Sequence, residues 1–255
     1  MDVLSAYHTD VGISKTTNQD SLFIKEAVTS KGQILFAVLC DGMGGMEMGE
    51  VASAMAIQEC AQWFSIIFPA QLCSFSPEKT VESLKALFCH INESIFQYGL
   101  ENLANMGTTL TAFLLVGELN FLIAHIGDTR VYRIKRGVSV LTQDHTFVER
   151  EVRRGNMTRK QAEHDPRKHI LLQCLGAGSE IHPQFLIGEP ERNCTYMLCS
   201  DGFRHKVSEK ELQEYLSPEQ LISQERIQRQ AIKLTELNKE RNEKDNISTI
   251  IICIR

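Results

Sequence analysis

The sequence predicts an α+β fold in which strands and helices form separate layers, and three observations support this. Apolar runs typical of strands and amphipathic stretches typical of helices come in blocks, without the strict alternation of a doubly wound fold. The run ILFAVLC at 34–40 is apolar at every position, as in a strand covered on both faces. No internal repeat, low-complexity segment or proline-rich linker divides 1–255, so we expect a single domain.

The amino-terminal part is predicted to contain strands followed by two helices. Apolar residues recur at helical spacing across 49–67, which indicates an amphipathic helix. Ser76 and Pro77 are typical of a helix cap and a first helical position, and the apolar stripe across 81–96 indicates a second helix. Strands are expected before these helices at 3–8, 21–25 and 34–40.

From residue 106 the pattern changes to short apolar runs separated by polar or glycine-containing turns. This pattern is typical of an antiparallel meander. The segment 145–169 is strongly polar and rich in arginine and lysine, so we expect one or two short surface helices there.

The carboxy-terminal part is predicted to contain a last helix between strands. Ser217, with Gln220 three residues later, matches a capping box and predicts a helix that continues to about residue 241. The closing stretch DNISTIIICI predicts a strand from Asp245. Two earlier strands are expected at 184–187 and 195–199.

Composition limits the function classes. With 43% hydrophobic and 23% charged residues the chain is typical of a globular protein, and a formal net charge of −5 gives no general affinity for nucleic acid or anionic membranes. The start MDVLSAYHTD lacks the basic segment and apolar core of a signal peptide, and no window reaches the apolar length of a membrane helix. We therefore expect a cytoplasmic protein with no nucleic-acid or membrane partner, while export without a classical signal stays open.

Five aspartates at the ends of predicted strands form the candidate site. Each alone has an ordinary explanation, because Asp-Gly and Asp-Asn are common turn dipeptides. If the fold brings these strand ends together, a divalent cation would offset the repulsion among ionised carboxylates. A set of oxygen ligands without a histidine or cysteine pattern indicates magnesium or manganese. Two such ions sharing one carboxylate would deprotonate a water for attack on a phosphate ester. The five residues are Asp20, Asp41, Asp128, Asp201 and Asp245.

Six motifs in order carry a resemblance to a known family. They are TDVG with NQD at 9–20, DGMGG at 41–45, GTT at 107–109, GDTR at 127–130, SDG at 200–202 and DN at 245–246. Together they resemble the metal-dependent serine/threonine protein phosphatases of the PP2C (PPM) family, particularly the compact bacterial members, over nearly the whole chain. The resemblance implies a four-layer αββα sandwich with two central antiparallel sheets flanked by helices. It also implies a centre of two Mn²⁺ or Mg²⁺ ions, with a third, weaker ion.

The same resemblance implies roles for individual residues. Asp41 would bridge the two ions, and the carbonyl of Gly42 would bind one of them. Asp201 and Asp245 would complete one site, and Asp20 would act nearby through water. Asp128 matches the family position of the weaker ion, and Asp201 could share that ion.

Two positions depart from the family pattern. Lys15 stands where a phosphate-binding arginine is usual, three positions before Asn18, and lysine lacks the two-point grip of guanidinium. We hypothesise that Lys15 still contacts the substrate phosphate; the alternative is a solvated loop lysine. Met43 stands where eukaryotic relatives often have a histidine, so the leaving group must take its proton from water or another residue. His145, His164 and His169 are candidates for this role, although a surface histidine is more often only solvated.

Three further features have structural alternatives. The segment of about 145–183 corresponds to the variable flap of bacterial relatives, and its basic residues could attract acidic phosphopeptides; an ordinary charged surface explains it equally well. Thr108 and Thr109 are expected to support the metal-binding edge. Glu50 is expected to stabilise the first turn of its helix.

The sequence therefore predicts a metal-dependent phosphatase acting on phosphoserine and phosphothreonine through a metal-activated bridging water. Its implied partners are phosphoproteins and a cognate serine/threonine protein kinase. Two alternatives remain: a catalytically weak module that uses the fold for binding or regulation, and a hydrolase of small phosphate esters.

Overall fold

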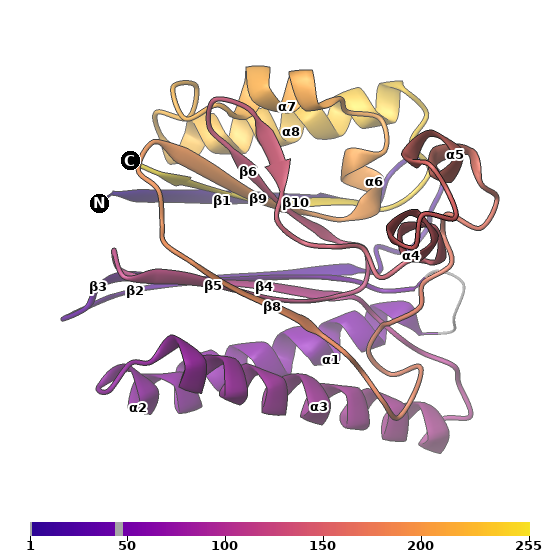
Figure 1. Ribbon diagram of the computed structural model, residues 1–255, viewed down its shortest axis with the longest axis horizontal. Coiled ribbons are helices and arrows are strands. Elements are labelled where there is room, and N and C mark those ends of the chain that lie inside the picture. Colours follow the sequence, from indigo (N-terminus) through magenta and orange to yellow (C-terminus); the bar gives the residue numbers. More distant parts are fainter. Residues whose placement is uncertain (1, 44–47) are drawn as a thin grey trace.

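The structure is a computed structural model that describes residues 2–43 and 48–255 of the protein. Two five-stranded antiparallel sheets pack face to face, and helices cover the outer face of each sheet (Figure 1). The predicted four-layer αββα sandwich is confirmed.

The first sheet has strand order β2-β3-β4-β5-β8, and the first helices of the chain cover its outer face (Figure 1). Leu35, Ala37 and Leu39 of β3 face the second sheet, whereas Phe36 and Val38 pack against the helices. This two-sided burial explains why the run 34–40 is apolar at every position. The strands are β2 (Asp20–Thr29), β3 (Gly32–Asp41), β4 (Leu110–Val116), β5 (Asn120–Ile126) and β8 (Gln184–Gly188). The helices are α1 (Gly49–Gln62), the π-helical η1 (Trp63–Ile67), α2 (Phe68–Leu72) and α3 (Pro77–Glu101).

The second sheet has strand order β1-β10-β9-β6-β7, and the last helices of the chain cover its outer face (Figure 1). In β10, Ile250 and Ile252 lie in the core between the sheets, while Ile251 and Cys253 pack in the cluster beneath α7 and α8. The strands are β1 (Val3–Asp10), β6 (Arg130–Ile134), β7 (Val138–Val140), β9 (Cys194–Cys199) and β10 (Ile247–Ile254). The helices are α6 (Asp201–Arg204), α7 (Glu209–Leu216) and α8 (Gln224–Glu240).

The predicted single meander after residue 106 is wrong. β4 pairs with β5 in the first sheet, and β6 pairs with β7 in the second. The chain changes sheet around Gly127, whose φ of +114° is open to glycine. The run of short strands was thus identified, but its division between two sheets was not.

The helix predicted from Ser217 begins later. Ser217 ends α7, and α8 is capped by Ser223, whose Oγ accepts the backbone N–H of Arg226 at 3.2 Å. The capping box that forms lies earlier, where Ser208 and Glu211 exchange hydrogen bonds at the start of α7. Competing Ser-x-x-Glu/Gln patterns in one stretch therefore misplaced the boundary. The last strand likewise begins at Ile247, two residues after Asp245.

One helical run corrects the expectation about membrane helices. The run Gly49–Leu72 is long and apolar enough to cross a membrane by length and composition. Its inner side chains, including Ala52, Ala56 and Trp63, are buried against the first sheet. Core helices pass the same test, so this run is weak evidence for a membrane span.

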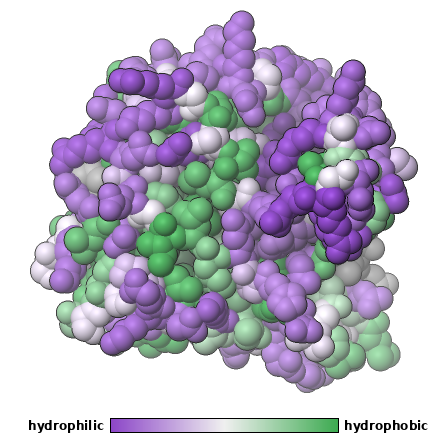
Figure 2. Space-filling model, in the orientation of Figure 1, coloured by the Kyte–Doolittle hydropathy of each residue, from purple (hydrophilic) through white to green (hydrophobic). Residues whose placement is uncertain are grey.

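The polar segment, residues 145–169, lies at one end of the sandwich. It contains two short helices, α4 (Phe147–Arg153) and α5 (Arg159–His164), as predicted, and they lie beside α6 (Figure 1). Hydrophilic side chains gather over α4 and α5 at the right of the view in Figure 2. The start of β2 and the end of β3 also meet at this end, because Asp20 is the register partner of Asp41.

Candidate metal centre

Asp20 and Asp41 face each other across neighbouring strand ends. Asp20 is 8% exposed, and neither oxygen of its carboxyl group has a hydrogen-bond partner. Burial, together with the charges of Asp201 and Asp245, raises the pKa of Asp20 to about 7, although the nearby hydroxyl groups of Ser248 and Ser200 oppose the shift. A buried carboxyl group with two unpaired oxygens is costly unless a cation completes it.

The main chain of Asp41 is held by the GTT motif. Its N–H donates to Thr109 Oγ1 at 2.9 Å, and its carbonyl accepts from the Thr109 N–H at 2.9 Å and from Thr108 Oγ1 at 3.0 Å. The expectation that these threonines support the acidic edge is confirmed. Gly42 follows in a crowded turn, where a Cβ atom would lie 2.2 Å from the Gly49 carbonyl oxygen. Only glycine fits there, and its backbone stays close to the carboxylates.

Asp201 and Asp245 come from the second sheet. Asp201 opens α6 directly after β9, and Asp245 lies in the loop that enters β10. A Cβ atom on Gly202 would lie 2.2 Å from the Asn246 carbonyl oxygen and 3.2 Å from Asp245 Cβ, so glycine permits the close approach of the two segments. Asn246 fixes the loop further, because its Oδ1 accepts the N–H of Gln19 at 2.9 Å.

Asp128 lies beside a cluster of arginines. Burial, together with the charge of Asp201, raises the pKa of Asp128 to about 7, while Arg204 opposes the shift. Arg204 Nη2 lies 3.7 Å from Asp128 Oδ2 and 3.5 Å from Asp144 Oδ2. Arg130 of the GDTR motif holds Asp144 through two hydrogen bonds of 2.8 and 2.7 Å. Although burial alone would raise it, the Arg130 hydrogen bonds hold the pKa of Asp144 below its ordinary value.

Lys15 lies at the edge where the aspartates gather. Its Nζ is 3.2 Å from Asp245 Oδ1, and its side chain is 33% exposed. The structure therefore brings Lys15 to the candidate carboxylates, which favours a role at the site over a remote loop position.

All five predicted aspartates converge. Burial raises the pKa of Asp41 well above its ordinary value, and the charges of the other four carboxylates raise it further. Mutual repulsion of this kind, together with the unpaired oxygens of Asp20, fits a site for divalent cations. Oxygen donors are the ligands that Mg²⁺ and Mn²⁺ prefer.

The predicted histidine candidates separate in the structure. His145 is half-buried, and its Nδ1 accepts the N–H of Gly127 at 3.2 Å. His164 is exposed on α5, where its Nδ1 contacts the Lys160 carbonyl oxygen at 3.0 Å. Only His169, of the three, joins the Asp201 side chain in a cluster.

Other residues of the site were missed from the sequence. His205 follows Asp201 by four positions, and its Nε2 lies 3.5 Å from Asp201 Oδ2. Glu243 lies 3.4 Å from the other ring nitrogen of His205 and accepts the N–H groups of Lys244 and Asp245. The Asp-x-x-x-His spacing was a signal for the first pair, since such residues share a helix face. Gly44 and Gly45 of the DGMGG motif lie outside the described residues.

Comparisons with known proteins agree with this geometry. A family model described as Protein phosphatase 2C matches residues 11–239. The protein phosphatase PhpP of Streptococcus pneumoniae is 32% identical over 216 residues, covering 82% of each chain. The solved structure of serine/threonine phosphatase Stp1 from Staphylococcus aureus has a TM-score of 0.86 at 27% identity, covering 100% of this chain and 96% of that one. The catalytic domain of the phosphatase PstP in complex with 2 manganese ions has a TM-score of 0.77 at 28% identity, covering 99% of each chain.

Proposed function

The chain belongs to the protein phosphatase 2C family, and we propose that it hydrolyses phosphoserine and phosphothreonine in proteins at a binuclear Mn²⁺ or Mg²⁺ centre. Its relatives in this family include proteins named serine/threonine phosphatases. The convergence of five carboxylates on one edge, with both oxygens of Asp20 unpaired, carries the proposal.

The chain's residues suit defined roles in this reaction. Asp41, Asp201 and Asp245 would hold the two ions, with the Gly42 carbonyl as a further ligand of one. Asp20 would act beside them through water. When bound, the ions would lower the pKa of a water and neutralise charge on the phosphoryl oxygens.

A third, weaker ion would use Asp128 and Asp201. Arg204 supports the assignment of weaker affinity, because its guanidinium lies 3.7 Å from Asp128 and already supplies positive charge there. A cation entering this position gains less than one entering beside Asp20, which has no arginine or lysine within ion-pair distance among the described residues.

Positioning and substrate binding fall to residues around the carboxylates. Thr108 and Thr109 fix the Asp41 backbone before substrate arrives, which reduces the reorganisation needed in the transition state. Lys15 would bind the substrate phosphate with a single point charge, since its ammonium lies at the edge of the site. The proton of the departing seryl or threonyl oxygen would come from water or from a nearby side chain.

The flap, the segment of about 145–183, would contribute to the choice of substrate. A hollow of about 380 Å³ beside the site is lined by Arg150, Arg153 and Arg154 together with Asp144 and His145. Arg153 donates to the neutral Gln143 side chain at 2.8 Å, so its charge stays available for an acidic peptide. Replacing Arg153 and Arg154 with glutamine should reduce the preference for acidic phosphopeptides over neutral ones. Equal preference before and after the change would leave only an ordinary charged surface.

One assay set tests the proposed function. Purified protein is given a phosphothreonine peptide or para-nitrophenyl phosphate, with Mn²⁺ or with a chelator, and compared with Asp41→Ala. Asp2→Asn is the matched control, because Asp2 is exposed and close to the amino terminus, at the end of the sandwich opposite the site (Figure 1). We expect Mn²⁺-dependent release of phosphate from the peptide, lost in Asp41→Ala and kept in Asp2→Asn.

Two other outcomes would favour the alternatives. No Mn²⁺-dependent turnover of either substrate would indicate a binding or regulatory module. Turnover of the small ester alone would indicate a small-ester hydrolase. If the peptide is hydrolysed, phosphoproteins and an opposing serine/threonine kinase are the partners to seek in the cytoplasm.

A further inference from the structure

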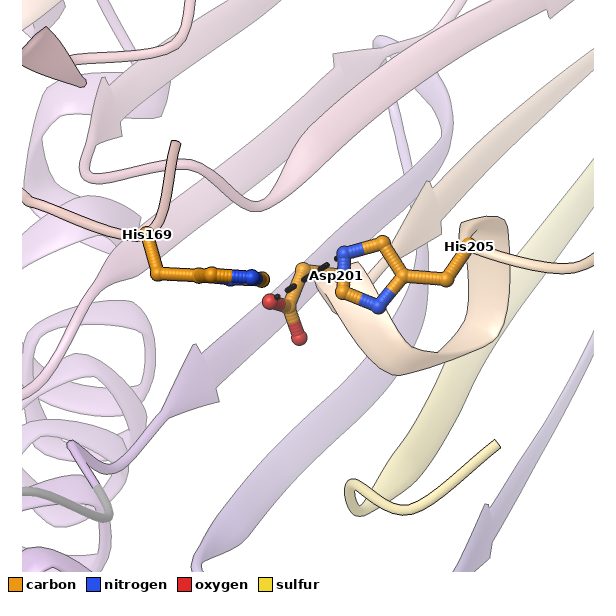
Figure 3. A group of neighbouring side chains, drawn as sticks. All are labelled: His169, Asp201 and His205. Carbon is orange, nitrogen blue, oxygen red and sulfur yellow. Dashed lines mark ion pairs between the residues drawn. The ribbon is translucent and has the colours of Figure 1, made fainter. Parts of the chain in front are cut away.

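Three side chains form a mixed histidine and carboxylate cluster at the rim of the centre. They are His169, Asp201 and His205, and one potential ligand atom from each lies within 4.8 Å of the other two. Figure 3 shows both imidazole rings directed at the Asp201 carboxylate from opposite sides. The rings are 6.0 Å apart between centroids and nearly perpendicular, at 88°.

The cluster joins two separate parts of the chain. Asp201 and His205 lie at and just after α6, one helical turn apart. His169 comes from the flap, where the Phe147 N–H donates to the Ile170 carbonyl at 2.9 Å and the Arg167 guanidinium lies 4.3 Å from the Phe147 ring centre. The backbone beside His169 is therefore anchored on α4, so its ring is presented to α6 by packed structure.

Glu243 orients the His205 ring. Its Oε2 lies 3.4 Å from His205 Nδ1, while His205 Nε2 lies 3.5 Å from Asp201 Oδ2. When an ion occupies the cluster, Glu243 would hold the ring tautomer with the proton on Nδ1, which leaves the lone pair of Nε2 for the ion. A carboxylate behind a ligating histidine is a recurrent arrangement at transition-metal sites, because it fixes the ring and strengthens its donor nitrogen.

The donor set differs from that of the carboxylate centre. Imidazole nitrogen is a good ligand for Zn²⁺ and similar ions, whereas Mg²⁺ prefers oxygen. Two histidines and one carboxylate leave a position open for water, as in several zinc sites. Bonds of about 2.0–2.1 Å would place tetrahedral ligand atoms roughly 3.3 Å apart. The ligand atoms now lie within 4.8 Å of one another, so side-chain rotation would have to bring them closer by up to about 1.5 Å.

We propose that His169, Asp201 and His205 bind a divalent transition-metal ion of the Zn²⁺ type, and that this ion inhibits the enzyme. Inhibition follows because Asp201 cannot serve both this site and the hard-ion centre with the same oxygens. The ion would also tie the flap to α6, across the approach to the carboxylates. The binding part stands on the cluster alone, whereas the inhibitory part rests on the proposed phosphatase function.

Binding is tested on the full chain loaded with Mg²⁺, which is diamagnetic. Zn²⁺ is added up to one equivalent while the histidine ring signals are followed by nuclear magnetic resonance. We expect the His169 and His205 signals to shift together, and the His164 and His90 signals to stay in place. His164→Ala is the matched control, since His164 lies in the same segment and outside the cluster. Unshifted His169 and His205 signals would overturn the site.

Inhibition is tested by phosphopeptide hydrolysis with saturating Mg²⁺ and increasing Zn²⁺, each variant being compared with its own zinc-free rate. His169→Ala and His205→Ala should each need at least about tenfold more Zn²⁺ for half inhibition, while His164→Ala should behave as the unaltered protein. Equal sensitivity of all variants would show that Zn²⁺ acts by displacing ions from the carboxylates, and would overturn the regulatory role. If no variant or unaltered protein hydrolyses the peptide, the proposed function fails, and the ring signals alone decide the binding site.

Discussion

Asp20 and Asp144 are buried carboxyl groups at the same end of the sandwich, yet they have opposite surroundings. Asp144 receives two hydrogen bonds from Arg130 and lies 3.5 Å from Arg204, and its pKa is held below the ordinary value against the effect of burial. Neither carboxyl oxygen of Asp20 has a hydrogen-bond partner within 3.5 Å, and burial is the main cause that raises its pKa to about 7. The first carboxylate is neutralised by the chain itself, whereas we propose that a cation from outside neutralises the second. The same residue type is thus structural in one place and, in the proposed function, part of the metal site in the other.

The largest expected effect concerns activity. Asp41→Asn should lower kcat/KM on a phosphopeptide by a factor on the order of 10³ or more, because bound ions supply several kcal/mol of stabilisation in the transition state. Asp20→Asn and Asp128→Asn should lose less, since neither is expected to bind both ions. Initial rates at saturating Mn²⁺ measure this. If Asp20→Asn proved as inactive as Asp41→Asn, the special position of Asp41 would be wrong.

The second effect concerns the free energy of unfolding, and it compares the surroundings of Asp144 and Asp20 directly. Asp144→Asn should destabilise the metal-free protein by about 3–5 kcal/mol, because it leaves Arg130 without its counter-charge and Arg204 with Asp128 as its remaining partner. Asp20→Asn should leave the metal-free protein equally or more stable, because it removes a buried, repelled carboxyl group. Denaturant unfolding in the presence of a chelator compares the two variants. Equal destabilisation by both would erase the distinction between them.

These two surroundings were not equally visible in the sequence. Asp20, Asp41 and Asp201 could be predicted because each lies at the start or the end of an apolar strand, and the ends of neighbouring strands gather at one edge of a sheet. The contacts between Asp144, Arg130 and Arg204 could not, since they join residues 14 and 60 positions apart that meet only after the chain changes sheet. Which arginine reaches a buried carboxylate depends on the order of the strands in the two sheets. That order was predicted wrongly where the chain changes sheet at Gly127.

Local signals had the same limit elsewhere in the chain. Ser76 was correctly predicted as a cap, and its side chain accepts the N–H of Lys79. Ser217 carried a comparable pattern but ends a helix, because Ser208 and Ser223 cap the helices on either side of it. Layer order was predictable from the family resemblance, whereas the choice among neighbouring caps depended on which helix face met the sheet.

The third effect is a pH dependence of the metal-free protein. Asp20 and Asp128 both have pKa values raised from 3.8 to about 7 in the folded state, so the folded chain binds more protons than the unfolded chain between pH 4 and 7. Stability is then highest below pH 4 for these groups and falls as pH rises through 7. Unfolding in chelator at pH 5.5 and pH 8 should show lower stability at pH 8.

Two controls sharpen this expectation. Saturating Mn²⁺ should reverse the trend, because it stabilises the ionised carboxylates by mass action, by about 2.7 kcal/mol at a hundred times its Kd. Asp20→Asn should flatten the metal-free profile. A metal-free protein that became steadily more stable from pH 5.5 to pH 8 would contradict the raised pKa values.

The smallest effect concerns Lys15, the one lysine or arginine within ion-pair distance of Asp20, Asp41, Asp201 or Asp245 among the described residues. If Lys15 binds the substrate phosphate, Lys15→Ala should raise KM for a phosphopeptide by about tenfold, the loss of roughly 1.5 kcal/mol expected for a hydrogen bond to a charged group. Lys15→Arg should restore or lower KM, since guanidinium adds a second hydrogen bond. Lys25→Ala, at an exposed lysine on β2, serves as the control.

The role of Lys15 also tests whether the surroundings of Asp20 and Asp144 differ as proposed. Should it act as Arg130 does, as a built-in counter-charge, Lys15→Ala would leave KM unchanged and weaken the metal-free protein instead. The paired groups are 33% and 44% exposed, so solvent screening keeps such a contribution small, within about 1 kcal/mol. A small stability change with a clear rise in KM would therefore place Lys15 with the substrate, leaving the Asp20–Asp41 edge dependent on cations from outside.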